Sequence, residues 1–359
     1  MKAGKIDVEE LVRGDVRKLS PYVCARDLYK EAEVFMDANE NAFGSTASLE
    51  GVDLTRYPDS DLNPLRDKLA EFVGGNEGIT RRNIVVGNGS DEIIDLLVRT
   101  FAEKGENIVQ AVPGYSMLNV CAGISGVQVR EVNCDANLQP KAEEILEKVD
   151  AKTKMVALVS PNSPVGNIIE WQRIQKLLDE SGVIVYVDEA YGEFARATLA
   201  PKVLEYENLV VSKTLSKAWG LAALRVGYAI GDERIIGNIR KIKPPYNVGS
   251  VSNKLALEAL SRKGKMEEYV SQMEEEKKLL ESALCAMGLE VFETVANFSV
   301  FRLPKQFDSK LVQKRIAAKG IIVRDRSALP FMENCIRITV GTRDENKRCL
   351  AALKEAMEK

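Results

Sequence analysis

The chain has 359 residues, 45% of them hydrophobic, which is long enough for two domains or for one large α/β domain with a smaller partner. Its 50 basic and 53 acidic side chains leave a net charge of −3, so there is no electrostatic basis for binding nucleic acid or an anionic membrane. Histidine is absent, which excludes Ser-His-Asp and Cys-His machinery and every histidine-containing metal site, and we expect no metal centre.

We predict that the N-terminal region forms an arm and is not a targeting segment. Residues 1–14 have no apolar stretch typical of a signal peptide, and no apolar run in the chain approaches the ~20 residues of a membrane span. We therefore expect a cytoplasmic protein with free thiols, because the six cysteines form no CxxC pair. A short helix falls within 1–33, a strand at 34–36 precedes a polar loop at 37–44, and a helix over 65–73 follows Asn63-Pro64.

Strands and helices then alternate. We predict strands at 84–86, 108–112, 127–132, 155–159 and 183–187, with helices at 93–101, 115–122 and 171–180. Continuous apolar strands joined by helices indicate an α/β fold with a mostly parallel sheet covered by helices on both faces. Functional side chains are expected at the carboxyl ends of such strands.

The sequence changes character after residues 243–245. A long charged helix over 256–286 is followed by strands at 289–292, 298–303, 321–323 and 336–340, a helix over 310–319 and a closing helix. This pattern is typical of a smaller α+β domain. We divide the chain into an arm that contributes to the small domain (1–50), a large domain (51–246) and a small C-terminal domain (247–359).

A lysine stands just after an apolar strand that begins at 209–211. The turn carries Ser216 and Lys217, and Arg225 precedes a second apolar run at 226–230. A lysine held on rigid backbone and partly desolvated suits a nucleophilic amine, while Ser216 and Arg225 suit a phosphate. An amine that forms a Schiff base beside a phosphate clamp is what pyridoxal 5'-phosphate requires. The alternative is an ordinary surface turn with a solvated lysine.

Three other clusters follow predicted strands. The glycine turn at 87–92 leads into a helix at Gly89, Ser90 and Asp91. It lacks the third glycine of a dinucleotide-binding fingerprint. The start of the helix could bind a phosphate, or Ser90 or Asp91 could simply cap it. Asn162 lies in a rigid proline-rich loop and could donate to a phenolate oxygen of a bound ring, unless the loop is only a tight turn. Asp188 ends an apolar strand near Tyr191, where a protonated pyridine nitrogen would compensate its charge. A metal site or helix cap is the alternative for Asp188.

Two arginines lie in the C-terminal strands. Arg337 falls inside an otherwise apolar strand, where an arginine is seldom tolerated without an anionic partner, and we expect it to bind a substrate anion. Arg324 lies at the end of a strand, next to Asp325. It could bind a substrate anion or form an ion pair with Asp325, and the sequence favours neither.

With these motifs in order, the chain resembles the fold type I pyridoxal-phosphate aminotransferases, and among them the histidinol-phosphate aminotransferase family. The resemblance extends from Leu19-Ser20-Pro21-Tyr22 to the strand that contains Arg337. It implies a large cofactor-binding domain, a small domain, and a homodimer with active sites at the subunit boundary. The small-molecule substrates would be an amino donor such as glutamate and a keto acceptor.

The resemblance also implies roles for individual residues. Lys217 would bind the cofactor covalently and move the proton, Asp188 would pair with the ring nitrogen, and Asn162 and Tyr191 would bond the phenolic oxygen. Tyr115 would stack on the ring. The cofactor phosphate would contact Ser216, Arg225, the backbone of Gly89, Ser90 and Asp91, and Tyr57 from the other subunit. The substrate would contact Tyr22, Asn39, Arg324 and Arg337.

The chain departs from the family pattern at four positions. Val165, Ala42, Trp219 and Ala223 replace the usual threonine, proline, phenylalanine and glycine, and none of these changes removes a catalytic group. The substrate stays open between histidinol phosphate and an aromatic amino acid, and a threonine-phosphate decarboxylase would share the same clamp and lysine. A binding or regulatory module without turnover is the non-enzymatic alternative.

Overall fold

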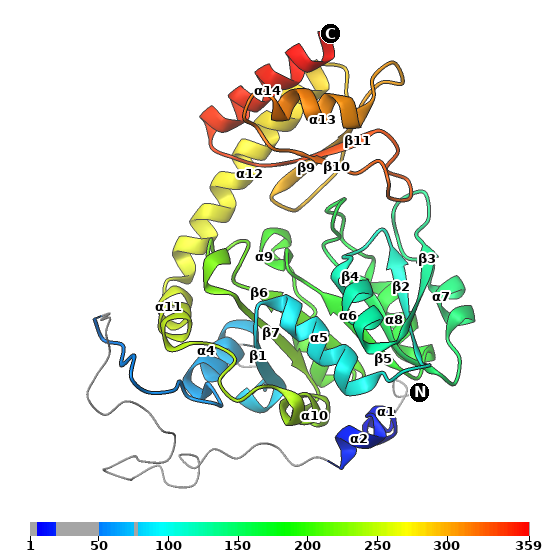
Figure 1. Ribbon diagram of the computed structural model, residues 1–359, viewed down its shortest axis with the longest axis vertical. Helices are drawn as coiled ribbons and strands as arrows, with labels where there is room; N and C mark the ends of the chain where they lie inside the picture. Colours follow the sequence, from blue (N-terminus) through cyan, green and yellow to red (C-terminus); the bar gives the residue numbers. More distant parts are fainter. Residues whose placement is uncertain (1–5, 19–49, 75–77, 359) are drawn as a thin grey trace.

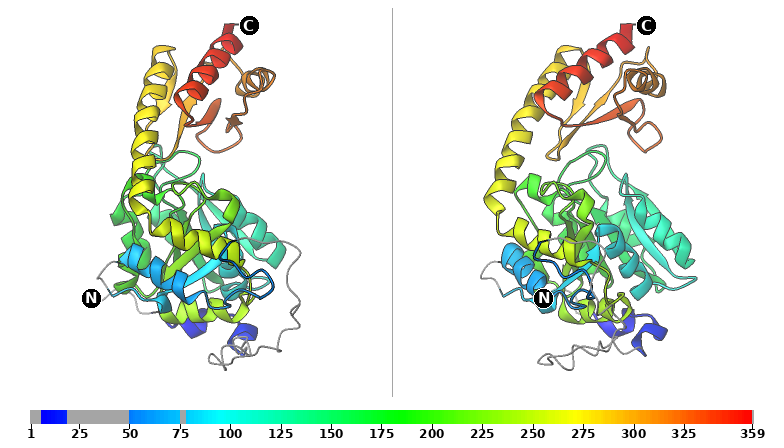
Figure 2. Two further views of the ribbon diagram at one scale, coloured as in Figure 1. Left: turned by 90° about the vertical axis from the view of Figure 1, so that its left-hand side faces the viewer. Right: turned by 60° about the vertical axis from the view of Figure 1, so that its left-hand side comes forward.

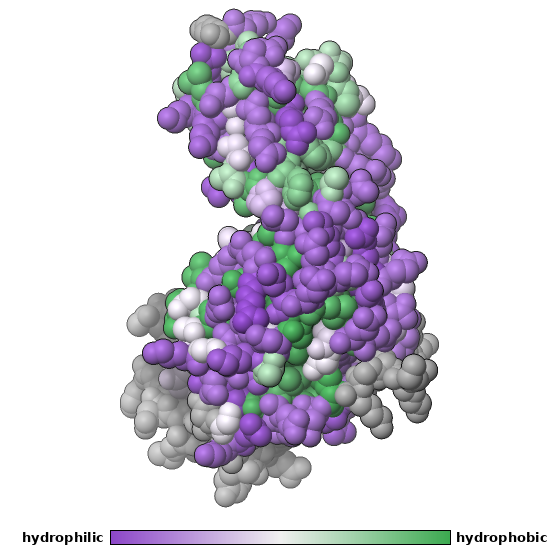
Figure 3. Space-filling view, turned by 90° about the vertical axis from the view of Figure 1, so that its right-hand side faces the viewer, coloured by the Kyte–Doolittle hydropathy of each residue, from purple (hydrophilic) through white to green (hydrophobic). Residues whose placement is uncertain are grey.

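The computed structural model describes residues 6–18, 50–74 and 78–358. They form a large domain and a small domain, linked by the long helix α12 (Lys263–Ala286) that runs from one to the other (Figures 1 and 2). Viewed from the side, the surface narrows to a notch between the two domains (Figure 3). Within the described ranges, no helix combines the length and apolar character needed to cross a bilayer.

The large domain is built on a seven-stranded sheet with the order β1-β7-β6-β5-β4-β2-β3. Its strands are β1 (Ile84–Asn88), β2 (Asn107–Val112), β3 (Gln128–Asn133), β4 (Thr153–Val159), β5 (Ile184–Asp188), β6 (Leu209–Thr214) and β7 (Val226–Gly231). The pairs from β6 to β3 are parallel, whereas β7 is antiparallel to both β6 and β1. The predicted fold class, an α/β domain on a mostly parallel sheet, is confirmed.

Burial on both faces explains why the strands are continuously apolar. In β5, Ile184 and Tyr186 point into one core, while Val185 and Val187 point into the other. The helices that cover the first face are α5 (Ser90–Phe101), α6 (Met117–Ser125) and α10 (Glu233–Ile242), and those on the second are α4 (Asn63–Gly74), α7 (Ala142–Lys148) and α8 (Trp171–Glu180). Successive side chains of each central strand are thus buried on opposite faces of the sheet.

The small domain contains an antiparallel sheet with the order β10-β11-β9-β8. Its elements are β8 (Glu290–Phe292), β9 (Phe298–Arg302), β10 (Arg324–Asp325), β11 (Cys335–Thr339), α13 (Ser309–Ala317) and α14 (Arg343–Glu358). One face packs against α13 and α14, with Ile336 and Ile338 in that core. The other face carries Phe298 and Cys335 into a cluster with Tyr191 of the large domain. This second face therefore looks toward the large sheet.

The structure differs from the sequence predictions in the C-terminal third. The strand predicted at 321–323 is wrong, because backbone pairing forms only at β10. The helix predicted over 256–286 is two helices, α11 (Ser250–Leu260) and α12, separated at residues 261–262. Ala256 of α11 and Met266 and Val270 of α12 join the core of the large domain, so the packing boundary lies within α12 rather than at residue 246.

The described part of the N-terminal arm packs on the large domain. It comprises α1 (Val8–Leu11) and α2 (Gly14–Arg17). Val8, Val12 and Val16 are buried in the same core as α5 and α10. Residues 6–18 therefore pack with the large domain.

Candidate active site

The functional side chains meet in a cavity of about 430 Å³ between the carboxyl edge of the large sheet and the inner face of the small domain. The residues predicted from the sequence that line it are Ser90, Asp91, Tyr115, Asp188, Tyr191, Ser216, Lys217, Arg225, Arg324 and Arg337. They come from six separate stretches of the chain. The stretches of the large domain meet because parallel neighbouring strands end at one edge of a sheet, whereas Arg324 and Arg337 come from the small-domain sheet that faces this edge.

Lys217 is fixed by the turn that follows β6. The buried Leu215 donates its backbone N–H to the carbonyl of Val226 at 2.9 Å, and the N–H of Gly220 returns to the carbonyl of Lys217 at 3.0 Å. The Nζ atom of Lys217 lies 5.7 Å from the centre of the Tyr191 ring. A primary amine is thus held at the cavity wall, beside the ring of Tyr191.

Asp188 is the last residue of β5, and its side chain is buried. Its carboxylate accepts a 2.9 Å hydrogen bond from the N–H of Ala190. Burial raises the pKa of Asp188 to about 6, and the acids Asp91 and Glu189 act in the same direction. No cation of the described chain forms an ion pair with it. A protonated ring nitrogen would supply that missing charge, so Asp188 fits the pyridine of pyridoxal phosphate.

The opposite end of the cavity fits a phosphate. Gly89 precedes α5 with a φ of +82°, and its lack of a side-chain cap leaves the N–H groups of the first helical turn free of a side-chain acceptor. The positive φ favours glycine at position 89, and a Cβ there would lie 2.4 Å from Nη2 of Arg225, so the guanidinium approaches the backbone at this point. Arg225 also donates to Oγ of Ser216 at 3.4 Å. Backbone N–H groups, a hydroxyl and a guanidinium converge at this point.

Asp91 forms an ion pair with Arg225, with 3.2 Å between Oδ2 and Nη2. Both side chains are more than a third exposed, so the pair contributes little net stability. The other carboxylate oxygen accepts a 2.9 Å hydrogen bond from the hydroxyl of Tyr115. Burial and this bond to Asp91 raise the pKa of Tyr115 above its usual range. Asp91 therefore orients both the guanidinium and the aromatic ring.

Asn162 lies behind the cavity rather than on its wall. Its Nδ2 atom donates to the carbonyl of Pro113 at 2.8 Å, while Oδ1 is buried without a hydrogen-bond partner among the described residues. This bond supports the turn that leads into Tyr115. One N–H of the amide is still available for a ring oxygen, since the amide carries two donors.

The small domain contributes three arginines. Arg324 of β10 pairs directly with Arg337 of β11, and Arg337 donates to Oγ of Ser163 at 3.1 Å. Burial lowers the pKa of Arg337, and Arg324 lowers it further. The third, Arg326, also lines the cavity and was missed by the sequence analysis. Its signal was the alternation of Arg324 and Arg326 on either side of Asp325, which places both arginines on one face of an extended segment.

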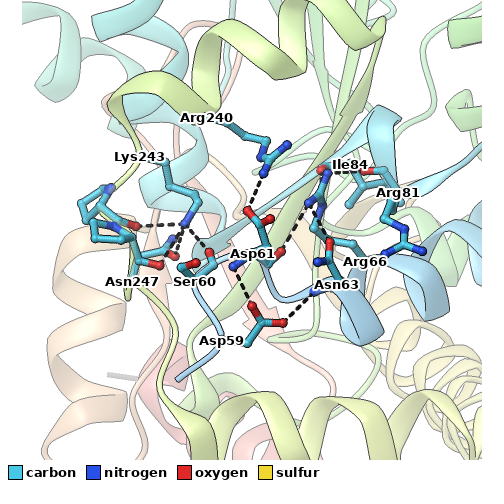
Figure 4. Close-up of polar contacts among 12 residues, drawn as sticks. Asp59, Ser60, Asp61, Asn63, Arg66, Arg81, Ile84, Arg240, Lys243 and Asn247 are labelled. Carbon is cyan, nitrogen blue, oxygen red and sulfur yellow. Dashed lines mark hydrogen bonds and ion pairs between the residues drawn. The ribbon is translucent and has the colours of Figure 1, made fainter. Parts of the chain in front are cut away.

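Tyr57 does not line the cavity of its own chain. Its ring stacks on that of Tyr246, with centroids 4.6 Å apart, and the side chain is about half exposed. The neighbouring segment is fixed to the large domain by Asp61, which bonds Arg240, and by Lys243, which donates to the carbonyl of Ser60 (Figure 4). Tyr22 and Asn39 lie outside the described residues.

Comparison with known proteins identifies the family. The family model "Aminotransferase class I and II" matches residues 26–353. The chain belongs to this family. Curated histidinol-phosphate aminotransferases from Bacteroides thetaiotaomicron and Flavobacterium johnsoniae are 40% and 37% identical to it, over 97% of this chain and 98% of each relative.

Solved structures agree with this assignment. The histidinol-phosphate aminotransferase from Clostridium acetobutylicum is 25% identical with a TM-score of 0.77, covering 85% of this chain and 91% of that one. The enzyme from Sinorhizobium meliloti, crystallised with pyridoxal 5'-phosphate, is 23% identical with a TM-score of 0.78, over 89% and 90% of the two chains. The fold is shared more widely, since a threonine-phosphate decarboxylase from Porphyromonas gingivalis reaches a TM-score of 0.72 at 20% identity.

Membership of the class I and II aminotransferases confirms the predicted enzyme class and cofactor. The protein is a transaminase that uses pyridoxal 5'-phosphate. The resemblance to the histidinol-phosphate aminotransferase family is confirmed as well. The non-enzymatic alternative, a module without turnover, has no support from these relatives.

Proposed function

We propose that this aminotransferase acts on L-histidinol phosphate. It would exchange the amino group of this substrate with 2-oxoglutarate, forming imidazole acetol phosphate and glutamate in histidine biosynthesis. The observation that carries the proposal is a cavity whose lining includes Lys217 and Asp188 together with the guanidinium groups of Arg324 and Arg337. Curated histidinol-phosphate aminotransferases at 34–40% identity over nearly the whole chain support the substrate.

In this proposal each residue has one task. Pyridoxal phosphate, when bound, withdraws electrons from the amino-bearing carbon of the substrate and so makes the proton on that carbon acidic. Lys217 anchors the cofactor before the substrate arrives; its amine, once free, takes up that proton and returns it. Asp188 keeps the ring nitrogen protonated by pairing with it. Tyr191 and Asn162 donate to the phenolic oxygen, and Tyr115 covers the ring face.

The remaining contacts hold the two anionic groups. The cofactor phosphate is assigned to Ser216, Arg225, the backbone from Gly89 to Asp91, and Tyr57 of the partner subunit. Arg324 and Arg337 bind the substrate anion, with Tyr22 and Asn39 beside it. The functional unit in this proposal is a homodimer in the cytoplasm. Support for the shared site comes from Tyr57, which is half exposed and does not line the cavity of its own chain.

A panel of half-reactions tests the proposed substrate. The cofactor-loaded protein is mixed with L-histidinol phosphate, L-phenylalanine or O-phospho-L-threonine, and the loss of the visible absorption band of lysine-bound cofactor is followed. We expect the fastest loss with L-histidinol phosphate. Faster reaction with L-phenylalanine would instead assign an aromatic aminotransferase, and release of carbon dioxide from phosphothreonine would assign a decarboxylase.

A further inference from the structure

Three arginines share one face of the small sheet. Arg324 lies opposite Arg337 in the β10–β11 ladder. The ladder continues beyond β10, because the N–H of Arg326 donates to the carbonyl of Cys335 at 2.9 Å. Side chains at alternate positions of an extended strand point the same way, as do directly paired ones. All three guanidinium groups therefore project from this face, and all three line the active-site cavity.

No carboxylate from the same strand neutralises them. Asp325 points to the opposite face, where Oδ1 accepts from the hydroxyl of Ser309 at 2.6 Å and Oδ2 from that of Ser327 at 2.8 Å. The Nε atom of Arg326 is buried and has no hydrogen-bond partner among the described residues. A buried guanidinium N–H without a partner is costly, so this donor is poised for a ligand.

The side chains that line the cavity leave an excess of positive charge at the end formed by these three arginines. Among the described residues, two carboxylates line the cavity: Asp91 is paired with Arg225, and Asp188 lies at the exit of β5. Burial and the positive charges of Arg337 and Arg324 together lower the pKa of Arg326 to about 10. A single carboxylate would offset one charge of the cluster, whereas a phosphate monoester carries about −1.5 to −2 and offers three terminal oxygens.

We propose that Arg326 completes a three-arginine subsite for the phosphate monoester of the amino substrate and sets the preference for a phosphate over a carboxylate. Its Nε and Nη groups match phosphate oxygens that Arg324 and Arg337 leave free, since a guanidinium donates in a fixed fork. This inference deepens the proposed function and rests on it for the identity of the phosphate ester. Arg326 acts here as a specificity-determining residue.

The first test measures anion binding without turnover. Inorganic phosphate is titrated calorimetrically into the cofactor-loaded protein, in which the cofactor already fills the phosphate site at Arg225. We expect Arg326→Gln to weaken phosphate binding about tenfold or more, as loss of a charge-assisted hydrogen bond does. Arg348→Gln, which removes an exposed arginine of α14, serves as the matched control and should leave it unchanged. Equal phosphate affinity in wild type and Arg326→Gln overturns the inference.

The second test separates specificity from damage to the fold. kcat/KM is measured for L-histidinol phosphate and for L-histidinol, which lacks the phosphate. Arg326→Gln should reduce the ratio of the two values about tenfold, with Arg326→Lys in between; a purely structural residue would lower both values alike and keep the ratio. Should wild type fail to use L-histidinol phosphate, the proposed function fails, while the phosphate titration still decides the role of Arg326.

Discussion

The amine of Lys217 lies 5.7 Å from the centre of the Tyr191 ring, although the two residues follow different strands. Tyr191 comes after β5 and Lys217 after β6, and these strands are parallel neighbours. Their exits therefore share one edge of the sheet, with Asp188 on the same wall of the cavity. Lys217 and Asp188, the proposed nucleophile and partner of the ring nitrogen, are thus brought to one edge by the order of the strands.

Replacing Lys217 by alanine should abolish the visible absorption band of the bound cofactor. Transamination should fall by at least about a thousandfold, because both the anchor and the proton-transfer group are lost. Pyridoxamine phosphate should still bind, since it needs no lysine. Absorption spectra and steady-state rates check this, with Lys152→Ala at an exposed turn as the control. Retention of the band in Lys217→Ala would contradict the assignment.

Replacing Asp188 by asparagine should make apo-protein stability less dependent on pH. The folded pKa is raised from 3.8 to about 6, so the folded protein holds this proton to higher pH than the unfolded chain, and stability decreases as pH rises from about 4 to 6. The loss reaches about 3 kcal/mol at most. Asp188→Asn should therefore stabilise the apo-protein at pH 8 but not at pH 4, as measured by urea unfolding.

The same substitution should weaken cofactor function, since asparagine cannot keep the ring nitrogen protonated. Asp179→Asn, at an exposed position of α8, is the control for both readouts. A gain in apo stability together with unchanged activity would argue against Asp188 as the partner of the ring nitrogen.

Replacing Arg225 by glutamine should weaken pyridoxal phosphate more than pyridoxal. A charge-assisted hydrogen bond is worth about 1.5–3 kcal/mol, or roughly a 10- to 100-fold change in Kd. Pyridoxal lacks the phosphate, so its affinity should hardly change. Equilibrium binding of both compounds to the apo-protein measures the difference, and an equal loss for both would place the phosphate elsewhere.

Replacing Lys213 by methionine should destabilise the large domain. Lys213 lies 3.1 Å from Glu189 and 3.4 Å from Glu193, and all three side chains are at most 4% exposed. Removing one partner from a buried ion cluster leaves uncompensated charge and costs about 3–5 kcal/mol. Denaturant unfolding should show this loss, whereas Lys202→Met at the surface should stay within about 1 kcal/mol of wild type.

Tyr57 should act across a subunit boundary. Tyr57→Ala and Lys217→Ala are each expected to have low activity, but a mixed dimer contains one site in which both residues are intact. Mixing the refolded variants should therefore restore up to about a quarter of wild-type activity, by the statistics of random pairing of subunits. Activity that stays at the level of the separate variants would place Tyr57 in its own subunit.

The sequence predicted the parts of the site that depend on regular parallel strands. Asp188 and Lys217 follow continuous apolar runs, and the carboxyl ends of such strands meet at one edge. Arg326 could not be predicted in the same way, because β10 is only two residues long and mixes charges rather than showing an apolar pattern. The false strand at 321–323 has a related cause: Val323 is buried and Ile322 is exposed, as in a strand, but no described strand pairs with them. The proposed role of Tyr57 depends on contact with a second subunit, which the pattern of strands and helices in the sequence does not reveal.

The antiparallel course of β7 has a consequence for rearranging the chain. Because β7 returns directly beside β6, Lys217 and Arg225 lie on one short reversal of the chain, with no crossover helix between them. A circular permutant opened at the exposed turn of Lys104 and Gly105 would leave this reversal uncut. In such a permutant Lys217 and Arg225, the proposed covalent and ionic contacts of the cofactor, would stay close in sequence. Gly89 would instead lie near the new C-terminus, far in sequence from Asp188.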